Sequence, residues 1–559
     1  MDTRRYILAI GLSMLVLIAY MRFFAPQPPV EQPAPQHPQQ QTAAAQKAEE
    51  KAPAPHPKTV VAAKAIAVAS KSRDIIIETD VIKAVVNTAG GVITKWELKD
   101  YREADKEEVG FMVTVRKLFG GEKKAEKPKK PLGNVELFTR YEGVKPEDLI
   151  APLTVTPVEK ELRNLAAVEF LANADSIRLD NDHKSQTLVL TYRGPAGIAI
   201  EKKLTFYHNE YKVDVAVSTK GLDGYALALG TDFGLSDKIS SNASGRVGIA
   251  ALVDGKTIIE KTDSIKLELQ QSGTIDWFGQ EDKYFTATLL YGGPGIVTTK
   301  KTAAPKEIGD LLSTELLVKD KPESRSLTLY AGPKTFNLLQ AYGKGLERMV
   351  DYGWFGVLAK PMFWLMEQFY RITGNYGIAI ILLTIVVRIL LFYPSLKSAT
   401  AMEEMKSLQP QMTALREKYK KDPQKLNQEI MQLYKEHKVN PLGGCLPMLL
   451  QLPFFVALYN VLSVSIELRQ ASFIPFWIKD LSVHDPFYIL PVLMGVSMVF
   501  TMKMTSTSVD PQQQKIMMYM NIAFIFLFAW LPAGLLLYIT LSNVLSIVQQ
   551  LYVRKLIAK

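Results

Sequence analysis

A single arginine, Arg388, stands inside an apolar stretch that runs from Ile378 to Phe392. It follows Tyr376 by twelve residues, which in a helix places it roughly 18 Å along the axis. An arginine at that depth in a bilayer costs about 2.5–3.5 kcal/mol, so its surroundings must compensate. No Asp or Glu lies inside the long apolar stretches of the C-terminal part. Arg388 therefore either snorkels to the cytoplasmic face or lies in a water-filled cavity where it meets an incoming anion.

Other polar residues interrupt the apolar stretches. Thr384 lies one helical turn before Arg388 and shares its face. Further candidates for the lining of the same cavity are Gln451, Asn460, Ser463 and Asn543. Taken singly, each is typical of a residue that bonds neighbouring membrane helices together. Taken together around one arginine, they indicate a shared hydrated groove.

Five apolar stretches would have to position these residues. They cover residues 375–396, 442–466, 487–502, 516–530 and 533–553 within a core of residues 375–553, and we interpret them as membrane spans. A sixth apolar stretch, Tyr6–Met21, follows Arg4 and Arg5. We interpret residues 1–24 as an uncleaved transmembrane anchor and not a cleavable signal peptide, because Arg22-Phe23-Phe24 replaces a small-x-small cleavage site.

The charges of the loops orient these spans. The loop 397–438 holds nine Lys/Arg against six Asp/Glu, whereas the loop 467–485 holds two against three. The positive-inside rule then places the loop 397–438 and both termini in the cytoplasm. We therefore predict a multi-pass membrane protein with both termini in the cytoplasm and a large domain outside it.

Between the anchor and the five spans, the composition divides the chain into three segments. Residues 25–70 are rich in Pro, Ala and Gln and predict a flexible linker. Residues 71–342 alternate short β-branched runs with turn residues, which predicts a large β-sandwich. Residues 343–372 are apolar and aromatic but are interrupted by Lys360, Pro361 and Glu367, so they predict an amphipathic helix along the membrane interface.

The loop 397–438 predicts a cytoplasmic helical hairpin. Apolar residues recur every three or four positions on either side of Asp422-Pro423, a typical helix start. Four methionines lie in this loop: Met402, Met405, Met412 and Met431. These methionines either form an adaptable surface for apolar segments of other proteins or pack the seam of the hairpin.

Composition excludes several classes of site. The net charge of +10 suits a membrane surface or nucleic acid, but no helix-turn-helix or zinc-finger pattern supports nucleic acid. Cys445 is the only cysteine, and the six histidines show no ligand spacing, so we predict no metal site. No nucleotide-binding loop, paired carboxylates or nucleophile motif occurs, so we predict no cofactor and no enzymatic activity.

Several motifs, in order, resemble the YidC family of membrane protein insertases. The similarity is strongest from Tyr376 to Gln550 and looser over the predicted β-domain. The matching strings are Lys438-Val-Asn-Pro-Leu-Gly-Gly-Cys-Leu-Pro447, Glu467-Leu-Arg-Gln-Ala471, Asp485-Pro-Phe-Tyr-Ile-Leu-Pro491, Asp510-Pro-Gln-Gln-Gln-Lys-Ile-Met517 and Ser542-Asn543.

The resemblance implies a multi-pass protein of the bacterial inner membrane. Its expected parts are a membrane α-helical bundle of anchor plus five-span core, a periplasmic β-supersandwich and a groove open to cytoplasm and lipid. Arg388, Thr384 and Gln451 match the family's groove residues. Family members often carry a Tyr pair in the last span, but here Tyr538 is followed by Ile539. The implied partners are nascent membrane proteins, the lipid bilayer, the Sec translocon and its accessory proteins, and the ribosome. The short tail after Leu551 argues against ribosome docking through a long basic extension.

The residues and the resemblance together predict an insertase that acts passively on other membrane proteins. A rival from another class is a secondary transporter of an anionic solute, with Arg388 as counter-charge. Inverted repeats with broken helices would favour it, and the sequence contains none. A membrane-anchored carbohydrate enzyme is suggested only by the size of the β-domain.

Overall fold

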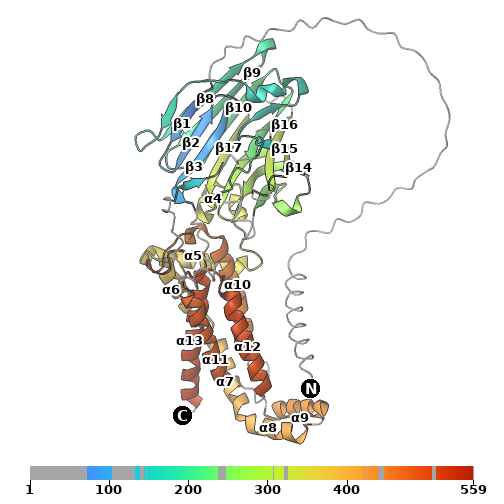
Figure 1. Ribbon diagram of the computed structural model, residues 1–559, viewed down its shortest axis with the longest axis vertical. Coiled ribbons are helices and arrows are strands. Elements are labelled where there is room, and N and C mark those ends of the chain that lie inside the picture. The colour runs from blue at the N-terminus through green and yellow to red at the C-terminus, as the bar shows by residue number, and fades with distance from the viewer. Residues whose placement is uncertain are drawn as a thin grey trace, which may run out of the picture. The chain divides into compact units, whose positions relative to one another are not determined.

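The computed structural model describes residues 72–103, 132–138, 144–145, 148–236, 247–305, 308–319, 325–420, 422–437, 446–505 and 511–557. The predicted anchor and linker, residues 1–24 and 25–70, lie outside the described residues, as do residues 438–445. The described chain forms strands first and helices afterwards (Figure 1). We call residues 74–333, which contain all the strands, the β-domain.

The β-domain contains a sheet of five strands in the order β4-β3-β2-β1-β7. Alternating burial along β1 places Ile75 and Ile77 in the core, as expected for a sheet with one covered face. The hairpin β1–β2 is antiparallel and β1–β7 is parallel. The strands are β1 (Asp74–Glu78), β2 (Ile82–Asn87), β3 (Val92–Arg102), β4 (Asn134–Glu136) and β7 (Ser176–Arg178).

A second sheet of twelve strands follows the path β13-β12-β14-β15-β17-β10-β9-β8-β6, with β11, β16 and β5 paired beside it. Its strands are β5 (Val155–Pro157), β6 (Leu171–Ala172), β8 (Ser185–Arg193), β9 (Ala199–Tyr207), β10 (Lys212–Lys220), β11 (Gly224–Thr231), β12 (Gly248–Val253), β13 (Lys256–Lys261), β14 (Glu268–Glu281), β15 (Phe285–Thr302), β16 (Leu311–Lys319) and β17 (Arg325–Pro333). Short 3-10 helices lie between them: η2 (Lys160–Ala167), η3 (Pro195–Gly197) and η4 (Thr262–Ser264).

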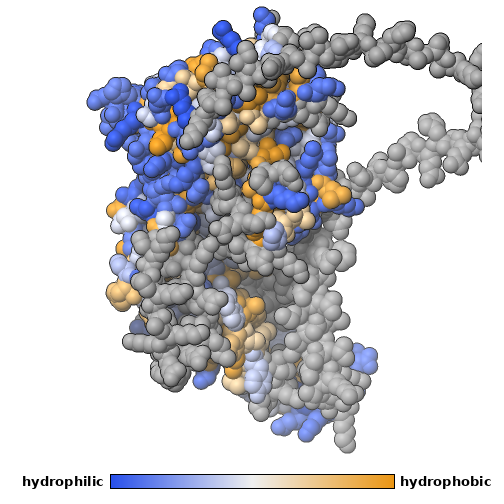
Figure 2. All heavy atoms as spheres, turned by 45° about the horizontal axis from the view of Figure 1, so that its top comes forward, coloured by the Kyte–Doolittle hydropathy of each residue, from blue (hydrophilic) through white to orange (hydrophobic). Residues whose placement is uncertain are grey.

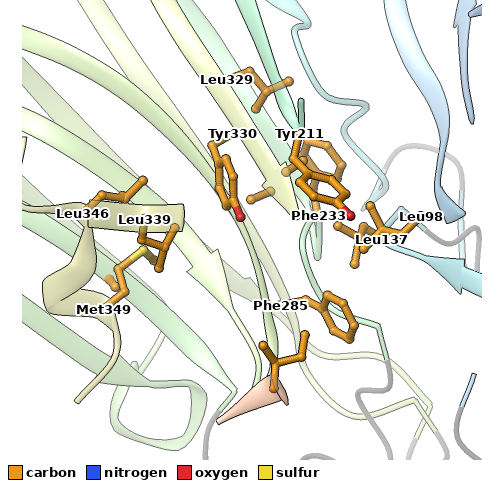
Figure 3. Packing of buried hydrophobic residues seen from close by; sticks show 14 of the residues in the cluster. Leu98, Leu137, Tyr211, Phe233, Phe285, Leu329, Tyr330, Leu339, Leu346 and Met349 are labelled. Carbon is orange, nitrogen blue, oxygen red and sulfur yellow. The ribbon is translucent and has the colours of Figure 1, made fainter. Parts of the chain in front are cut away.

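The two sheets share one hydrophobic core. Val213, Val215 and Val217 of β10 are fully buried, and the residues between them are not. Trp96 of β3 donates its Nε1–H to the carbonyl of Ala331 in β17, 3.0 Å away, and so bonds one sheet to the other. Figure 3 shows Leu98 and Leu137 close to Tyr211 and Phe233 within this core. The predicted β-sandwich is therefore confirmed.

A lysine is buried inside the β-domain. Lys202 of β9 is 1 % exposed, and its ammonium group donates to the carbonyls of Gly90, Gly91 and Leu153 at 2.7, 3.1 and 2.8 Å. It also lies 5.0 Å from the ring centre of Phe170. Three donors meet three backbone acceptors, so the lysine satisfies carbonyls that burial would otherwise leave without a donor.

The helices follow the last strand. They are α4 (Phe336–Tyr342), α5 (Gly356–Thr373), α6 (Tyr376–Leu390), α7 (Phe392–Ser407), α8 (Gln409–Lys418), α9 (Pro423–Glu436), α10 (Leu446–Val464), α11 (Ile489–Thr505), α12 (Pro511–Phe528) and α13 (Ala533–Ile557), with the 3-10 turns η5 (Leu346–Met349) and η7 (Ile466–Leu468). Leu339, Leu346 and Met349 pack together beside the strands (Figure 3). The Trp277 indole also donates to the Lys344 carbonyl at 3.1 Å.

By length and composition, the described segment Ala533–Val553 could cross a bilayer alone, and α6 with α7 could form a second, bent span. Shorter apolar segments are Leu450–Val464, Ile489–Met504 and Met518–Phe528. Among the coloured residues in the lower half of Figure 2, a patch of hydrophobic side chains is visible, mixed with polar ones. Many apolar side chains of the described helices are well exposed, among them Ile389, Val496, Phe526 and Val548. Exposed apolar surface of this extent is typical of contact with lipid.

The first predicted span, residues 375–396, is not one straight helix. α6 ends at Leu390, and α7 continues after a bend of 61°. Pro394 explains the break, because it lacks an N–H and its ring would collide with the carbonyl four residues earlier, that of Leu390. Arg388 therefore lies in the last turn of α6 and not near the middle of a straight span.

The described residues of the segment 397–438 are mostly helical, as expected, but the first half is broken between α7 and α8, where Pro410 occupies the first turn of α8. Asp422 caps α9, with its carboxylate accepting from the Lys425 N–H at 3.1 Å, and Pro423 follows at the first helical position. This local prediction is confirmed. In the segment 343–372, which we predicted to be one amphipathic helix along the interface, α5 begins only at Gly356, after the 3-10 turn η5.

We expect Lys202→Met to destabilise the β-domain. The change leaves the carbonyls of Gly90, Gly91 and Leu153 buried without a donor, at a cost of about 1–3 kcal/mol for each carbonyl. Urea unfolding of the full chain in detergent, followed by tryptophan fluorescence, measures the loss. Lys203→Met is the matched control, since Lys203 is exposed and pairs only with Glu201 at the surface. Equal stability of the two variants would contradict the interpretation.

Candidate functional site

Arg388 connects three helices. Its Nη2 group donates to the side-chain oxygen of Gln451 in α10 at 3.1 Å and to the backbone carbonyl of Ser542 in α13 at 2.6 Å. No carboxylate pairs with Arg388 in the part of the chain that the structure describes. The guanidinium charge is thus met by neutral dipoles, which leave it free of a permanent counter-ion.

The end of α6 positions this arginine. Because the helix stops at Leu390, Arg388 lies in its last turn, where unsatisfied backbone carbonyls favour a positive charge. The neighbouring residues Ile389 and Leu390 are 70 % and 67 % exposed. Arg388 therefore lies between the packed helices on one side and an open apolar surface on the other.

Tyr538, another residue predicted for the groove, also lies at this site. It is 1 % exposed and lies beside Arg388, Gln451 and Ser542. Ile539, which follows it, is partly buried against the core. A contact surface for clients at Tyr538 would therefore require the surrounding helices to part.

Thr384 and Asn460 make local contacts instead. Thr384 is fully buried, and its hydroxyl donates to the carbonyl of Ile380 at 2.6 Å within its own helix. The Asn460 amide donates to the carbonyl of Tyr352 at 2.7 Å, which bonds α10 to the segment before α5. Asn460 thus bonds two segments together, whereas Thr384 satisfies its hydroxyl within α6.

Asn543 and Ser463 complete the predicted set. The Asn543 amide donates to the Ser497 hydroxyl at 3.1 Å and so bonds α13 to α11. Ser463 lies in the last turns of α10 and is half-buried. Of the residues expected in the groove, the structure gathers Arg388, Gln451 and Tyr538 in one place.

The structure distributes the methionines of segment 397–438 in two ways. Met405 and Met412 are buried in a small cluster with Leu408 and Leu433, which is the seam between the helices. Met431 is 49 % exposed. The side chain of Met402 lies outside the described residues. Packing of the seam therefore accounts for Met405 and Met412. Among the methionines of this segment whose side chains are described, Met431 alone offers an exposed apolar surface.

One contact of the site had no signal in the sequence. The backbone carbonyl of Ser542 accepts the shorter of the two Arg388 hydrogen bonds. Every residue carries a carbonyl, so nothing in the residue types identifies this acceptor.

Comparison with known proteins identifies relatives of this chain. Residues 368–559 match the family model described as 60Kd inner membrane protein, and residues 123–365 match the YidC periplasmic domain. A membrane protein insertase YidC from Geobacter metallireducens is 35 % identical, with 99 % of each chain covered. Another from Geobacter sulfurreducens is 39 % identical over 70 % of this chain and 74 % of the relative.

This chain belongs to the YidC family. As a member of that family it is a membrane protein insertase of the inner membrane with a periplasmic β-sandwich domain. A solved structure of an active YidC insertase covers 85 % of this chain and 92 % of that one, at 18 % identity and a TM-score of 0.36. The resemblance drawn from the sequence motifs is confirmed by the relatives.

In this YidC-family chain a buried carboxyl lies directly after α10. The Oε1 atom of Glu467, in η7, is buried and has no hydrogen-bond partner. Burial, together with the nearby charge of Glu367, raises the pKa of Glu467 to about 7. Burial and the charge of Glu467 in turn raise the pKa of Tyr352. Ionisation of Glu467 is therefore costly in the folded protein.

We expect Glu467→Gln to stabilise the protein at alkaline pH. The folded-state pKa lies above the ordinary value of 4.5, so the folded state binds more protons than the unfolded state between about pH 4.5 and pH 7. Wild-type stability falls as pH rises through this window, by up to about 3 kcal/mol. Glutamine has no carboxyl to ionise, so the stability of the variant does not fall in this way as the pH rises.

Melting temperatures of the full chain in detergent at pH 5 and pH 8 measure the effect. The advantage of the Glu467→Gln variant should be largest at pH 8 and should shrink toward pH 5. Glu161→Gln, at an exposed position of η2, is the control and should show no such trend. A difference that is the same at both pH values contradicts the interpretation.

Proposed function

We propose that Arg388 draws the hydrophilic tail of a client membrane protein into a groove between α6, α10 and α13. The contacts of the guanidinium with the Gln451 amide oxygen and the Ser542 carbonyl carry the proposal. An arginine that donates only to neutral acceptors keeps most of its attraction for an anion, whereas a buried ion pair would cancel it. Tyr538 and Gln451 line the same place.

The apolar segment of the client leaves by the exposed faces of α10 and α13. Leu452 and Tyr459 of α10 are 50 % and 39 % exposed, and Val544 and Val548 of α13 are 44 % and 58 % exposed. Transfer of an apolar segment from water to lipid along these faces is favourable by about 25 cal/mol per Å² of buried surface. The insertase therefore needs no bound nucleotide, and we assign it no catalytic residue.

The six-span topology completes the proposal. Residues 1–24 form an anchor, α10 to α13 and the bent α6 form the five-span core, and both termini lie in the cytoplasm. Helices α8 and α9, with most of α7, form a cytoplasmic hairpin, and α5 lies along the membrane interface. On α5, Val357, Trp364 and Ile372 are 85 %, 60 % and 81 % exposed, as suits an interfacial helix. The Sec translocon and the ribosome are proposed partners.

Two cysteine variants test this topology in a Cys445→Ser background. Asn427 of α9 and Lys479 of the loop between α10 and α11 are both exposed. In intact spheroplasts an impermeant thiol reagent should label Lys479→Cys and spare Asn427→Cys, because the positive-inside rule places α9 in the cytoplasm. Both should be labelled after lysis. Labelling of Asn427→Cys before lysis would contradict the proposed orientation.

The charge at position 388 should control insertion of clients with acidic tails. We expect Arg388→Lys to retain most activity, Arg388→Ala to lose roughly tenfold, and Arg388→Glu to lose more, because a like charge repels the tail. Clients with neutral tails should be affected least. Protease protection of client proteins inserted into vesicles that contain the full-length insertase measures each rate.

Insertase abundance is measured alongside, so that misfolding is not mistaken for lost function. Arg178→Glu, at an exposed position of β7, makes the same change of charge away from the groove and should insert all clients normally. A simple snorkelling anchor would show no dependence on client charge. Equal insertion of acidic-tailed clients by wild type and Arg388→Glu would refute the electrostatic step.

A further inference from the structure

The loop between α10 and α11, residues 465–488, contains a short closed turn that the groove does not use. The Phe473 N–H donates to the Ile478 carbonyl at 2.9 Å, and Ile474 and Ile478 form an isolated β-bridge. We call residues 473–478 the aromatic turn. The bridge closes its base and leaves three residues at its tip.

Two adjacent aromatic residues at this tip have opposite surroundings. The Trp477 indole N–H donates to the Asp485 carboxylate at 2.7 Å. Asp485 is fully buried, and it also accepts from the backbone N–H of Leu490 in the first turn of α11 at 2.7 Å. Phe476, by contrast, is 82 % exposed. Trp477 therefore holds the turn against the helices, and the ring of Phe476 is left open to the surroundings.

The aromatic turn lies on the first turn of α6. Asn375 caps this helix, and its amide donates to the Phe473 carbonyl at 3.1 Å. The Phe473 ring packs directly on the backbone of Gly377, where a Cβ atom would lie only 2.1 Å from the ring. A side chain at position 377 would push the turn away. The aromatic turn is therefore fixed at the level where α6 begins.

The residues after the turn bond the start of α13. The Gly534 N–H donates to the Leu481 carbonyl at 3.1 Å. The Ala533 N–H donates to the Val483 carbonyl at 2.7 Å. Since α11 also begins at this loop, three helices have their first turns beside it, and the loop lies at one common end of the helical bundle.

This end of the bundle is the periplasmic one. The Arg469 Nη2 group in the same loop donates to the Arg102 carbonyl at the end of β3, 2.6 Å away. The β-domain that contains β3 matches the YidC periplasmic domain. The apolar stretches of α6, α11 and α13 begin directly after their first turns, so the border of the hydrocarbon lies close to the loop.

Lipid fits the open ring of Phe476 better than a protein does. A stable protein interface buries about 800 Å² on each partner, far more than the tip of a six-residue turn can offer. A bilayer needs no matching surface, and aromatic side chains gather at its interface with water. Trp530, between α12 and α13, is a second aromatic residue at this end and is 62 % exposed. Lys479 follows the turn and is also exposed, which suits contact with lipid phosphate groups.

We propose that Phe476 anchors the aromatic turn in the outer leaflet, with its ring among the lipid headgroups and the first acyl carbons. The ligand of this surface is the lipid itself. Because hydrogen bonds already fix the turn, lipid binding orders few additional groups. The anchor sets the height at which the first turns of α6, α11 and α13 meet the membrane. It does not depend on the proposed role of Arg388.

A spin label at the tip measures its surroundings. Phe476→Cys is labelled in the full-length chain with Cys445→Ser, in phosphatidylcholine vesicles. Oxygen concentrates in lipid and a nickel chelate stays in water, so the ratio of their collision rates reports depth. The ratio at position 476 should exceed that of a label at Lys256→Cys, an exposed site in β13, by about threefold or more. Equal ratios would place the tip in water, and protection from both reagents would show a protein cover; either result overturns the proposal.

The native ring is tested with a label at Lys479→Cys in the same background. Phe476→Ser should raise the collision rate of this label with the nickel chelate about twofold, because the turn loses its apolar contact with lipid. Phe476→Trp should leave the rate unchanged. Leu171→Ser is the matched control, since Leu171 in β6 is 78 % exposed but lies in the β-domain. A rate in Phe476→Ser equal to that of the control would show that the ring does not anchor the turn.

Discussion

The helical part of this protein depends on one electrostatic constraint, which is the placement of a full positive charge among apolar helices without a carboxylate. Arg388 meets it with an amide oxygen from α10 and a backbone carbonyl from α13. Each acceptor comes from a different helix, so the packing of α6, α10 and α13 and the hydrogen bonds of the arginine require each other. If any one helix moved away, a buried charged group would lose an acceptor at a cost of a few kcal/mol.

The bend between α6 and α7 helps to meet the same constraint. Pro394 prevents α6 from continuing past Leu390, and Arg388 consequently lies in a terminal turn, close to exposed apolar side chains. In a straight helix that continued past Leu390, an intact ladder of backbone bonds would surround the arginine, and fewer free carbonyls would lie nearby. The proline therefore lowers the cost of the charge and keeps it near a surface that a client could reach.

Local signals in the sequence predicted local structure well. The pair Asp422-Pro423 predicted the start of α9, and alternating β-branched runs predicted strands such as β10. The sequence was less informative about partners across space. Asn460 and Asn543 have the residue types of a hydrated groove but bond Tyr352 and Ser497 instead, because an amide serves either role and only tertiary placement decides between them. The proline signal for the bend after Leu390 was present in the sequence, but apolar periodicity alone predicted a continuous span.

Two arginines at opposite ends of α10 use the same chemistry. Arg388 and Arg469 both donate to backbone carbonyls of a distant segment, at 2.6 Å in each case, and neither has a carboxylate partner among the described residues. A backbone carbonyl cannot be protonated within the physiological range, so such contacts hold their geometry when the pH changes on one side of a membrane. Glu467 is the exception in this region, since its pKa of about 7 makes its charge sensitive to pH. The contacts of Arg388 are thus insulated from protonation, whereas Glu467, a titratable group, lies just beyond the far end of α10 and two residues from Arg469.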